Sequence, residues 1–513
     1  MNAYLRKEIR PLLPSFRLAL LLAASNCLVP IGSGGANEIW SALPFVFCPL
    51  AVLFFVLNAF GVECGSNLFS NLLAQPISRS RIWWTKSLLA LARVGTVLVI
   101  WWISFAFGRP GADLPSVMLG TGVTAVVIYS GGLWTMLLFR QAAVAFWFVL
   151  LVPGLLMAMA THQFEYLRYG EALVASVLMA YSVVGFLFAW RLFLRAEDVQ
   201  WTGGAITFPD WLRRSQRAQD SHSSRTRRPL RSVFFKELHL HQSQFLMAGV
   251  LALLHLVIIF MRNFDHAMSE SYPALDVLYN CFWVLWLVMP WLVGCAAVAE
   301  ERKLGTLEAQ LGAPVSRRRQ FLIKFATAML IAILLGTIMP FLLDGNRVAQ
   351  VFGLGENSAV WRLADSLMQH LPSGPLQLLA ADLCLFIARI DAGLVLAAIS
   401  VGVAALSFYA SSFARNTLQA LAPALVGLYV AAVSLFLAGD SSGFLDSEFW
   451  RSLLFYVLGL PALSLTLAEL AYWNFQQSDT GWPVWRRNLI VVLAVAVLVP
   501  AITTAILGMV NPD

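Results

Sequence analysis

Long apolar runs alternate with short polar segments along the whole chain. Six runs lie in the first part of the sequence, at about 15–31, 40–60, 87–107, 116–138, 142–160 and 172–194. Six more lie further on, at about 244–261, 276–299, 325–343, 391–413, 417–438 and 451–473, and a last run covers 488–510. About 20 apolar residues in a helix cross the hydrocarbon core of a bilayer, and tilting or breaking accommodates other lengths. The pattern predicts an all-α integral membrane protein with thirteen spans, or twelve if one run does not cross.

The composition agrees with a chain solvated by lipid. Apolar residues make up 59% of the 513 positions and charged residues only 12%, whereas about a quarter of a soluble domain is charged. The net charge of +7 comes from basic residues in the short segments between apolar runs, where the positive-inside rule explains them. This distribution argues against a nucleic-acid partner and predicts a cytoplasmic amino terminus.

A polar stretch divides the chain into two similar parts. Residues 196–231 contain seven arginines among Ser, Gln and Gly, which is typical of a cytoplasmic linker. The sequence therefore predicts a first six-span half at 1–195, the linker, a second six-span half at 232–475, and an extra carboxyl-terminal span within 476–513. The expected architecture is two tandem six-helix transmembrane bundles, a pseudo-dimer, plus one helix.

The polar segment between the second and third spans is repeated in the two halves. Seven residues match without a gap: Glu63, Leu73, Pro76, Ser78, Arg79, Arg81 and Lys86 correspond to Glu301, Leu311, Pro314, Ser316, Arg317, Arg319 and Lys324. Each half also has a Lys-Glu pair before its first span, at Lys7-Glu8 and Lys236-Glu237. Leu304, Leu307 and Leu311 recur at helical spacing, which predicts a short cytoplasmic helix with one apolar stripe.

The basic residues of the repeated segment stand at the start of the third span. They are Arg79, Arg81, Lys86, Arg317, Arg319 and Lys324. Lysine and arginine at this level interact favourably with anionic lipid headgroups. We therefore expect these six residues to hold the third spans at the membrane surface.

The run from Glu300 to Glu308, continuing into Pro314 to Arg317, resembles the coupling-helix segment of ABC type-2 transporter permeases. The six-span half with an amphipathic lead-in is similar to the same family. The resemblance implies an exporter permease in the inner (plasma) membrane of a bacterium, with two copies of a cytoplasmic ABC ATPase as partners. It also implies that the ATPase contacts fall on these residues: Glu63, Phe69, Leu73, Glu301, Gly305, Thr306, Leu307, Glu308 and Leu311.

No phosphate-binding G-x-x-x-x-G-K-[ST] loop occurs in the chain. We expect ATP and Mg²⁺ to bind the partner ATPase, and this chain to be a permease without a catalytic residue, metal or cofactor. Two other functions remain open: an ion-coupled secondary transporter and a membrane enzyme that acts on lipid-linked substrates.

A few polar residues fall within or beside the spans. Asn58 and Asn280 either hydrogen-bond between helices or line a substrate path. Asp382, Arg389 and Asp391 either belong to an external amphipathic helix at 375–390 or form an intramembrane ion pair. Arg93 is close enough to the cytoplasmic end of its span for its guanidinium to reach water.

Overall fold

The computed structural model contains helices and no strands among the residues that it describes. These are residues 13, 15–17, 19–24, 27, 48–61, 76–108, 113–164, 169–196, 229–267, 273–311, 315–352, 375–441, 460–476, 484, 486–488, 490–491, 494 and 498. The all-α fold class expected from the sequence is confirmed for this part of the chain.

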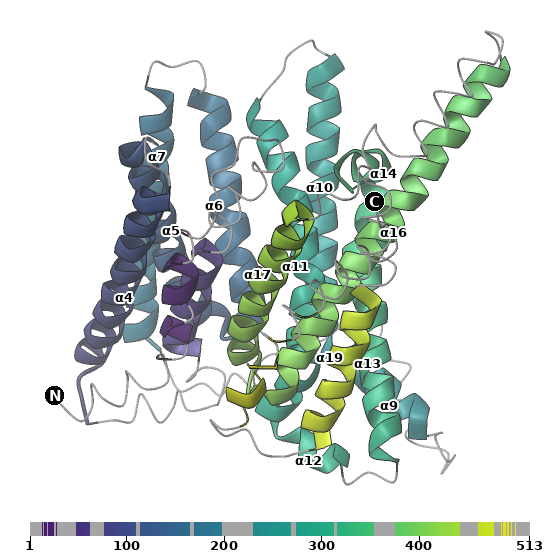
Figure 1. The fold of residues 1–513 in the computed structure, drawn as a ribbon. Helices are drawn as coiled ribbons and strands as arrows, with labels where there is room; N and C mark the ends of the chain where they lie inside the picture. Colours follow the sequence, from purple (N-terminus) through teal and green to yellow (C-terminus); the bar gives the residue numbers. More distant parts are fainter. Residues whose placement is uncertain are drawn as a thin grey trace, which may run out of the picture. The chain divides into compact units, whose positions relative to one another are not determined.

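Figure 1 shows the order of the helices along the chain. The first part contains α4 (Arg79–Gly108), α5 (Leu114–Phe139), α6 (Ala142–Phe164) and α7 (Gly170–Leu194). The second part contains α9 (Pro229–Leu240), α10 (Gln242–Ala267), α11 (Pro273–Leu304), α12 (Thr306–Leu311), α13 (Arg317–Ile333), the π-helix η2 (Leu334–Ile338), α14 (Met339–Phe352), α16 (Pro375–Phe413), α17 (Thr417–Ser441) and α19 (Leu460–Gln476). Three of these helices begin with proline, whose fixed φ angle and missing N–H suit the first helical position.

Among the residues that the structure describes, seven helices are long and apolar enough to cross a membrane. They are Arg79–Gly108, Leu114–Phe139, Ala142–Thr161, Gly170–Leu194, Gln242–Asn263, Arg317–Gly345 and Ala392–Phe413. Each coincides with one of the predicted runs. Shorter apolar helices at Ser15–Ala24, Cys48–Gly61 and Thr417–Ala431 coincide with three others, whereas most of the predicted run 488–510 lies outside the described residues. The chain is therefore a multi-pass membrane protein by the length and composition of its helices.

Two spans of the second half differ from the sequence-based expectation. The predicted run 325–343 is not one regular helix, because η2 follows α13 and Asp344 has non-helical angles (φ −154°, ψ 71°) inside α14. Conversely, residues 375–390 do not form a separate helix, since α16 runs without interruption through its 39 residues. Asp382, Arg389 and Asp391 belong to this helix, and their side chains lie outside the described set.

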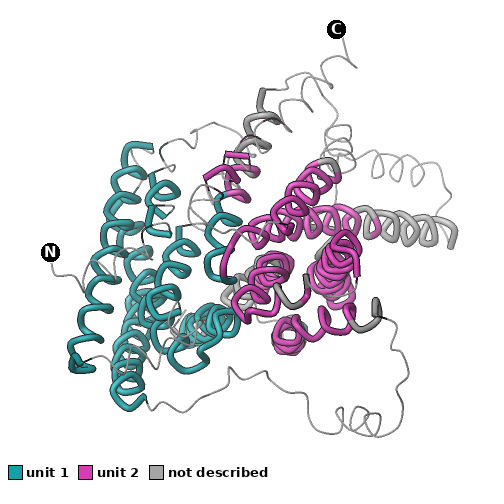
Figure 2. The backbone as a smooth tube through the Cα atoms, turned by 90° about the horizontal axis from the view of Figure 1, so that it is seen from below, with its two compact units in different colours: residues 1–226, 262–278, 416–426 teal, residues 227–261, 279–415, 427–513 magenta. Residues whose placement is uncertain are grey.

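The chain forms two compact units (Figure 2). Unit 1 consists of Met1–Thr226, Arg262–Leu278 and Asn416–Val426; unit 2 consists of Arg227–Met261, Tyr279–Arg415 and Gly427–Asp513. In unit 1, α5 packs against α4, α6 and α7; in unit 2, α16 packs against α13, α14 and α19.

Corresponding helices make corresponding contacts inside each unit. The third predicted span packs on the sixth in both, as α4 on α7 and as α13 on α19. Trp83 and Phe193 have ring centroids 5.7 Å apart in unit 1, and Phe321 and Phe475 are also 5.7 Å apart in unit 2. Because Trp83 and Phe321 are equivalent in the repeated segment, the sequence repeat extends to the packing of the spans.

Candidate functional site

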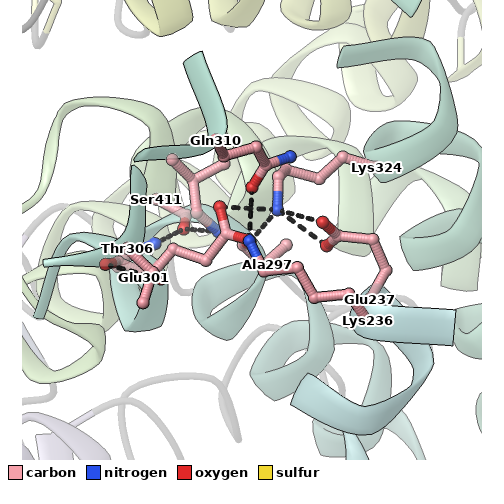
Figure 3. Close-up of polar contacts among 10 residues, drawn as sticks. Lys236, Glu237, Ala297, Glu301, Thr306, Gln310, Lys324 and Ser411 are labelled. Carbon is pink, nitrogen blue, oxygen red and sulfur yellow. Dashed lines mark hydrogen bonds and ion pairs between the residues drawn. The ribbon is translucent and has the colours of Figure 1, made fainter. Parts of the chain in front are cut away.

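A buried cluster of charged side chains lies within unit 2, at the start of α13 (Figure 3). The Lys324 ammonium donates to both carboxylate oxygens of Glu237, at 2.8 and 2.7 Å, and to the backbone carbonyl of Ala297 at 3.2 Å. It also forms an ion pair with Glu301, with Nζ 2.9 Å from Oε2. The side chains of Lys324 and Glu301 are 0% exposed and that of Glu237 is 1% exposed. One lysine therefore connects α9, α11 and α13.

A second lysine extends the cluster to the short helix α12. The Lys236 ammonium lies 2.7 Å from Glu301 Oε1 and donates to Gln310 Oε1, also at 2.7 Å. Gln310 is buried, whereas the side chain of Lys236 is 41% exposed. Glu301 is thus bound by one buried and one half-exposed lysine, and α12 is tied to α9 through Lys236.

Two carboxylates and two ammonium groups balance the formal charge of the cluster. Burial raises the pKa of Glu237 above its ordinary value, and the neighbouring Glu301 carboxylate raises it further; the Lys324 ammonium opposes both effects. Burying ions costs several kcal/mol each by order of magnitude, and this cost is recovered only where partners satisfy the ions. The four close contacts of Lys324 supply such partners. The cluster can therefore fix the positions of α9, α11, α12 and α13 relative to one another.

His241 stands at the turn between α9 and α10, beside the cluster. Burial lowers its pKa to about 3, and the Lys324 charge contributes in the same direction. The imidazole is therefore neutral in the folded protein at pH 7 and adds no charge to the cluster. Protonation of His241 in acid would place a charge at the buried junction of α9 and α10, so the stability of this junction should depend on pH.

We expect His241→Gln to reduce the loss of stability of this protein in acid. A histidine with a lowered folded-state pKa contributes its stability above its unfolded pKa of about 6.5 and loses it as pH falls toward 3. Glu237 has a raised pKa, so its contribution to stability changes with pH in the opposite sense. The effect of His241 is therefore isolated only by comparing the variant with the wild-type protein at each pH. Thermal unfolding midpoints of both proteins at pH 7.5 and pH 5 measure the effect. An equal fall in the two proteins would contradict a neutral buried His241.

The backbone at Gly305 separates α11 from α12. Its φ of +68° lies in the left-handed region, which costs glycine little, and its N–H donates to Arg302 O at 3.1 Å. An added Cβ would meet nothing within 4 Å, so glycine is required here for its backbone angles and not for space. Leu304, before the break, is 59% exposed, whereas Leu307, after it, is 5% exposed. The expected apolar stripe is therefore interrupted at Gly305.

The end of α16 holds the last turns of α11. Ser411 Oγ accepts hydrogen bonds from the backbone N–H groups of Val298 and Ala299, at 3.0 and 2.8 Å. Arg302 donates to Ala414 O at 3.1 Å. These three bonds fix the part of α11 that carries Glu301 against the fourth span of unit 2. A displacement of α12 would thus be transmitted to α16 as well as to α9 and α13.

Unit 1 contains the counterpart of the central lysine. Lys86, which aligns with Lys324, is 4% exposed and donates to Ala59 O at 3.5 Å. Ala59 aligns with Ala297, and the donor and acceptor are 27 residues apart in both units. Lys86 also lies over the ring of Phe60, 5.6 Å from its centroid. The same buried contact between the third and second spans therefore occurs twice in the chain.

No protein-family model matches the sequence, and no curated protein is significantly similar to it. The assignment of a function therefore depends on the residues of this chain and their geometry. Within the described ranges, no group of three His, Cys, Asp or Glu side chains is placed to hold a metal ion.

The structure places the expected coupling residues in different surroundings. Glu301 and Leu307 are buried, Thr306 donates to Glu301 O at 3.4 Å, and Gly305 is exposed. Glu308 and Leu311 lie in α12, but their side chains are outside the described set. Glu63, Phe69 and Leu73 are also outside the described residues. Any docking surface on this segment of unit 2 would consequently include Leu304 and Gly305 rather than Glu301.

The six basic residues fall into two groups. Arg79, Arg81, Arg317 and Arg319 are exposed, and their contact with the lipid surface stays a prediction. Lys86 and Lys324 are buried, so the expectation that they contact lipid headgroups is wrong. The ammonium groups face carbonyls and carboxylates of the preceding helices, because the third span packs against those helices at this level. Arg79 also donates to Leu194 O and Ala196 O, both at 3.0 Å, at the end of α7.

The structure describes the side chains of two of the three other polar residues named from the sequence, Asn58 and Arg93. Asn58 is buried and donates to Ser15 Oγ at 3.5 Å, a contact between helices. The side chain of Asn280 lies outside the described residues. Arg93 is 8% exposed, with its guanidinium carbon 5.5 and 5.7 Å from the ring centroids of Phe16 and Phe55. It is packed between aromatic rings rather than extended to water.

Sequence reasoning assigned no role to Gln310 or Ser411, and Lys236 and Glu237 were noted only as part of the lead-in. One signal was present: a Lys-Glu pair precedes the first span of each half. A duplicated acid in an amphipathic helix, together with a duplicated lysine in the third span, could have indicated an ion pair. No pattern in the sequence points to Ser411, because serine is common in transmembrane helices.

Proposed function

We propose that this chain is the membrane-spanning subunit of an ATP-driven exporter of the ABC type-2 kind. Two six-span halves would move against each other when two cytoplasmic ATPase subunits bind and hydrolyse ATP. The proposal includes an amino terminus on the cytoplasmic side of a bacterial plasma membrane and a linker at 196–231 on the same side. The extra carboxyl-terminal span would place Asp513 outside.

The observation that carries the proposal is the pair of equivalent buried lysines. Lys86 and Lys324 bind the carbonyls of Ala59 and Ala297 at the base of the third span. A transporter driven by two ATPases needs two equivalent points of attachment, one for each half. The duplicated contact supports such attachment points at the polar segment that follows Ala59 and Ala297 in each half.

The cluster in unit 2 supports a mechanical role for α12. A force on this helix would pass through Gln310 and Lys236 to α9, and through Glu301 and Lys324 to α13. Ser411 and Ala414 would pass it to α16. Buried ion pairs resist separation, because breaking one leaves an uncompensated charge. The segment is therefore suited to move with the spans as one body.

The test is whether an ATPase associates with the exposed surface at the end of α11. We expect the full chain, purified from native membranes, to retain an ABC ATPase, and Leu304→Glu to weaken this association by about tenfold or more. Leu304 is 59% exposed and takes no part in the charge cluster, so the variant should insert and fold normally. Quantitative co-purification and Mg²⁺-dependent ATP hydrolysis are the readouts.

Arg318→Glu is the matched control. Arg318 is exposed at the start of α13, and its replacement also adds negative charge near the same segment without changing α11 or α12. Retention of the ATPase by the control and its loss from the Leu304 variant would support docking at this surface. Absence of any ATPase from the wild-type preparation, or equal retention by both variants, would contradict the proposal.

An ion-coupled transporter is the second candidate, favoured by the interrupted third span of unit 2. Discontinuous helices commonly form ion and substrate sites in secondary transporters, and π-helical turns often mark functional positions. Here η2 precedes the non-helical Asp344, and His255 of α10 lies within electrostatic range of that carboxylate. Transport that persists without ATP and follows an imposed proton gradient would favour this candidate.

A further inference from the structure

A π-helical turn interrupts the third span of unit 2. The turn η2 joins α13 to α14, and the backbone N–H of Met339 donates to Leu334 O, five residues earlier in the chain. Pro340 supplies a local cause, because a proline has no N–H to donate to Gly336 O and its ring would clash with that carbonyl in a regular α-helix. Turns of this kind inside α-helices often lie at functional positions.

Two neighbouring helices fit closely against this turn. A Cβ added to Gly336 would lie 2.3 Å from Pro290 Cγ of α11 and 2.8 Å from Ser400 Oγ of α16, so only glycine allows this approach. Thr337 Oγ1 donates to Ser400 Oγ at 3.1 Å, and both side chains are buried. Pro290 lies inside α11, where it removes one main-chain hydrogen bond. The turn therefore bears on α11 and α16 at one level of the span.

The part of the span before the turn is firmly held. Lys324 pairs with the buried carboxylates of Glu237 and Glu301, and separating these groups would leave charges without compensation. The ring centroid of Phe321 lies between 5.2 and 6.1 Å from those of four other aromatic side chains: Phe325, Phe408, Tyr472 and Phe475. These rings belong to α13, α16 and α19, so α13 is fixed to the helices around it.

The part of the span after the turn is held by a different kind of contact. Phe341 of α14 packs on Ala392 and Leu396 of α16, and its ring lies 3.4 Å from the position of a Cβ added to Gly393. Alanine and glycine present a smooth surface to the ring, and apolar contact has no preferred direction. Leu342, the next residue, is 73% exposed. At this contact α14 can shift along α16 at a lower cost than α13 could.

We propose that η2 is a hinge of the third span in unit 2, about which α14 swings on α16 while α13 stays fixed to its neighbours. The contact of Gly336 with Pro290 is the fulcrum, and the hydrogen bond from Thr337 to Ser400 keeps the turn in place. The hinge would serve the transport function proposed above, on which its purpose rests, because a transporter has to open and close its path. The bending itself does not depend on the source of energy.

The test is a distance measurement between spin labels by double electron–electron resonance, in the full chain without ATP or an ATPase. The native cysteines are first replaced, and the labels are attached to cysteines at exposed positions. The outer pair joins Leu342 of α14 to Leu465 of α19, and the inner pair joins Leu322 of α13 to the same Leu465. We expect two distances for the outer pair and one for the inner pair. A single narrow distance for both pairs would overturn the hinge.

Pro340→Ala tests the cause of the bending. Alanine restores an N–H for the Gly336 carbonyl, so the turn should stiffen and the outer pair should show one distance. Pro153→Ala is the matched control, because it removes a proline from inside α6 of unit 1 and should leave both pairs unchanged. Two outer distances that persist in Pro340→Ala, or a loss of one of them in the control, would contradict a hinge at η2.

A second variant keeps the test decisive if Pro340→Ala does not fold. Thr337→Val removes the hydrogen bond to Ser400, so it should broaden the outer distances and leave the inner distance unchanged. An unaltered outer pair in this variant would exclude a role for the turn. Because the measurement uses neither ATP nor a partner, the hinge and the proposed exporter function can fail separately.

Discussion

Lys324→Met is expected to destabilise the protein by about 3–5 kcal/mol, the range for removal of one partner from a buried ion pair. The change removes the ammonium that lies within 2.9 Å of both Glu237 and Glu301, and these carboxylates are almost fully buried. Methionine fills a similar volume, so the loss is one of charge compensation more than of packing. The thermal unfolding midpoint of the purified chain in detergent measures the effect.

Two further variants separate this explanation from general damage. Lys236→Met removes a lysine from the same cluster, but its side chain is 41% exposed, so the expected cost is about 1 kcal/mol or less. Adding Glu237→Gln to Lys324→Met should restore part of the stability, because it removes the carboxylate that lost its partner. A double variant less stable than Lys324→Met would show that the ion pair is not the source of the effect.

Gly294→Ala is expected to separate α11 from α16 and to lower the stability of the protein; under the function proposed above, it should lower ATP-coupled transport as well. An added Cβ would lie 2.5 Å from Ala404 O, 2.6 Å from Ser407 Cβ and 2.9 Å from Phe408 N. Two of these atoms belong to the backbone of α16 and cannot rotate away, so the cost should reach the upper part of the range for overpacking, about 1–3 kcal/mol. The shift would also strain the hydrogen bonds from Val298 and Ala299 to Ser411, one turn further along α11.

Gly249→Ala is the matched control, because Gly249 also lies within a helix of unit 2 but has nothing within 4 Å of an added Cβ. Alanine is the better helix former by up to about 1 kcal/mol, so this variant should be as stable as wild type or slightly more stable. If Gly294→Ala behaves like this control in thermal unfolding, the close approach of α11 and α16 is not a constraint on the fold.

The polar residues show where prediction from the sequence stopped. The repeat between Glu63 to Lys86 and Glu301 to Lys324 identified the correct segment, and Gly305 stands at the break that a short helix after α11 requires. The side of the protein that each charge faces could not be predicted. Lysine at the cytoplasmic end of a span has the same pattern whether it reaches lipid headgroups or a buried carboxylate, and the outcome depends on which helix packs beside it.

The sequence by itself determined the all-helical membrane class, the positions of the seven long spans described by the structure, and the internal repeat. A chain this apolar is solvated by lipid, and helices satisfy their backbone hydrogen bonds internally, which hydrocarbon requires. Only the tertiary structure decided which charges are buried together. Glu237, Glu301 and Lys324 are separated by 64 and 23 residues in the chain, and no local pattern couples them. Their contact arises where α9, α11 and α13 converge, since each buried ion is stable there only in the presence of the others.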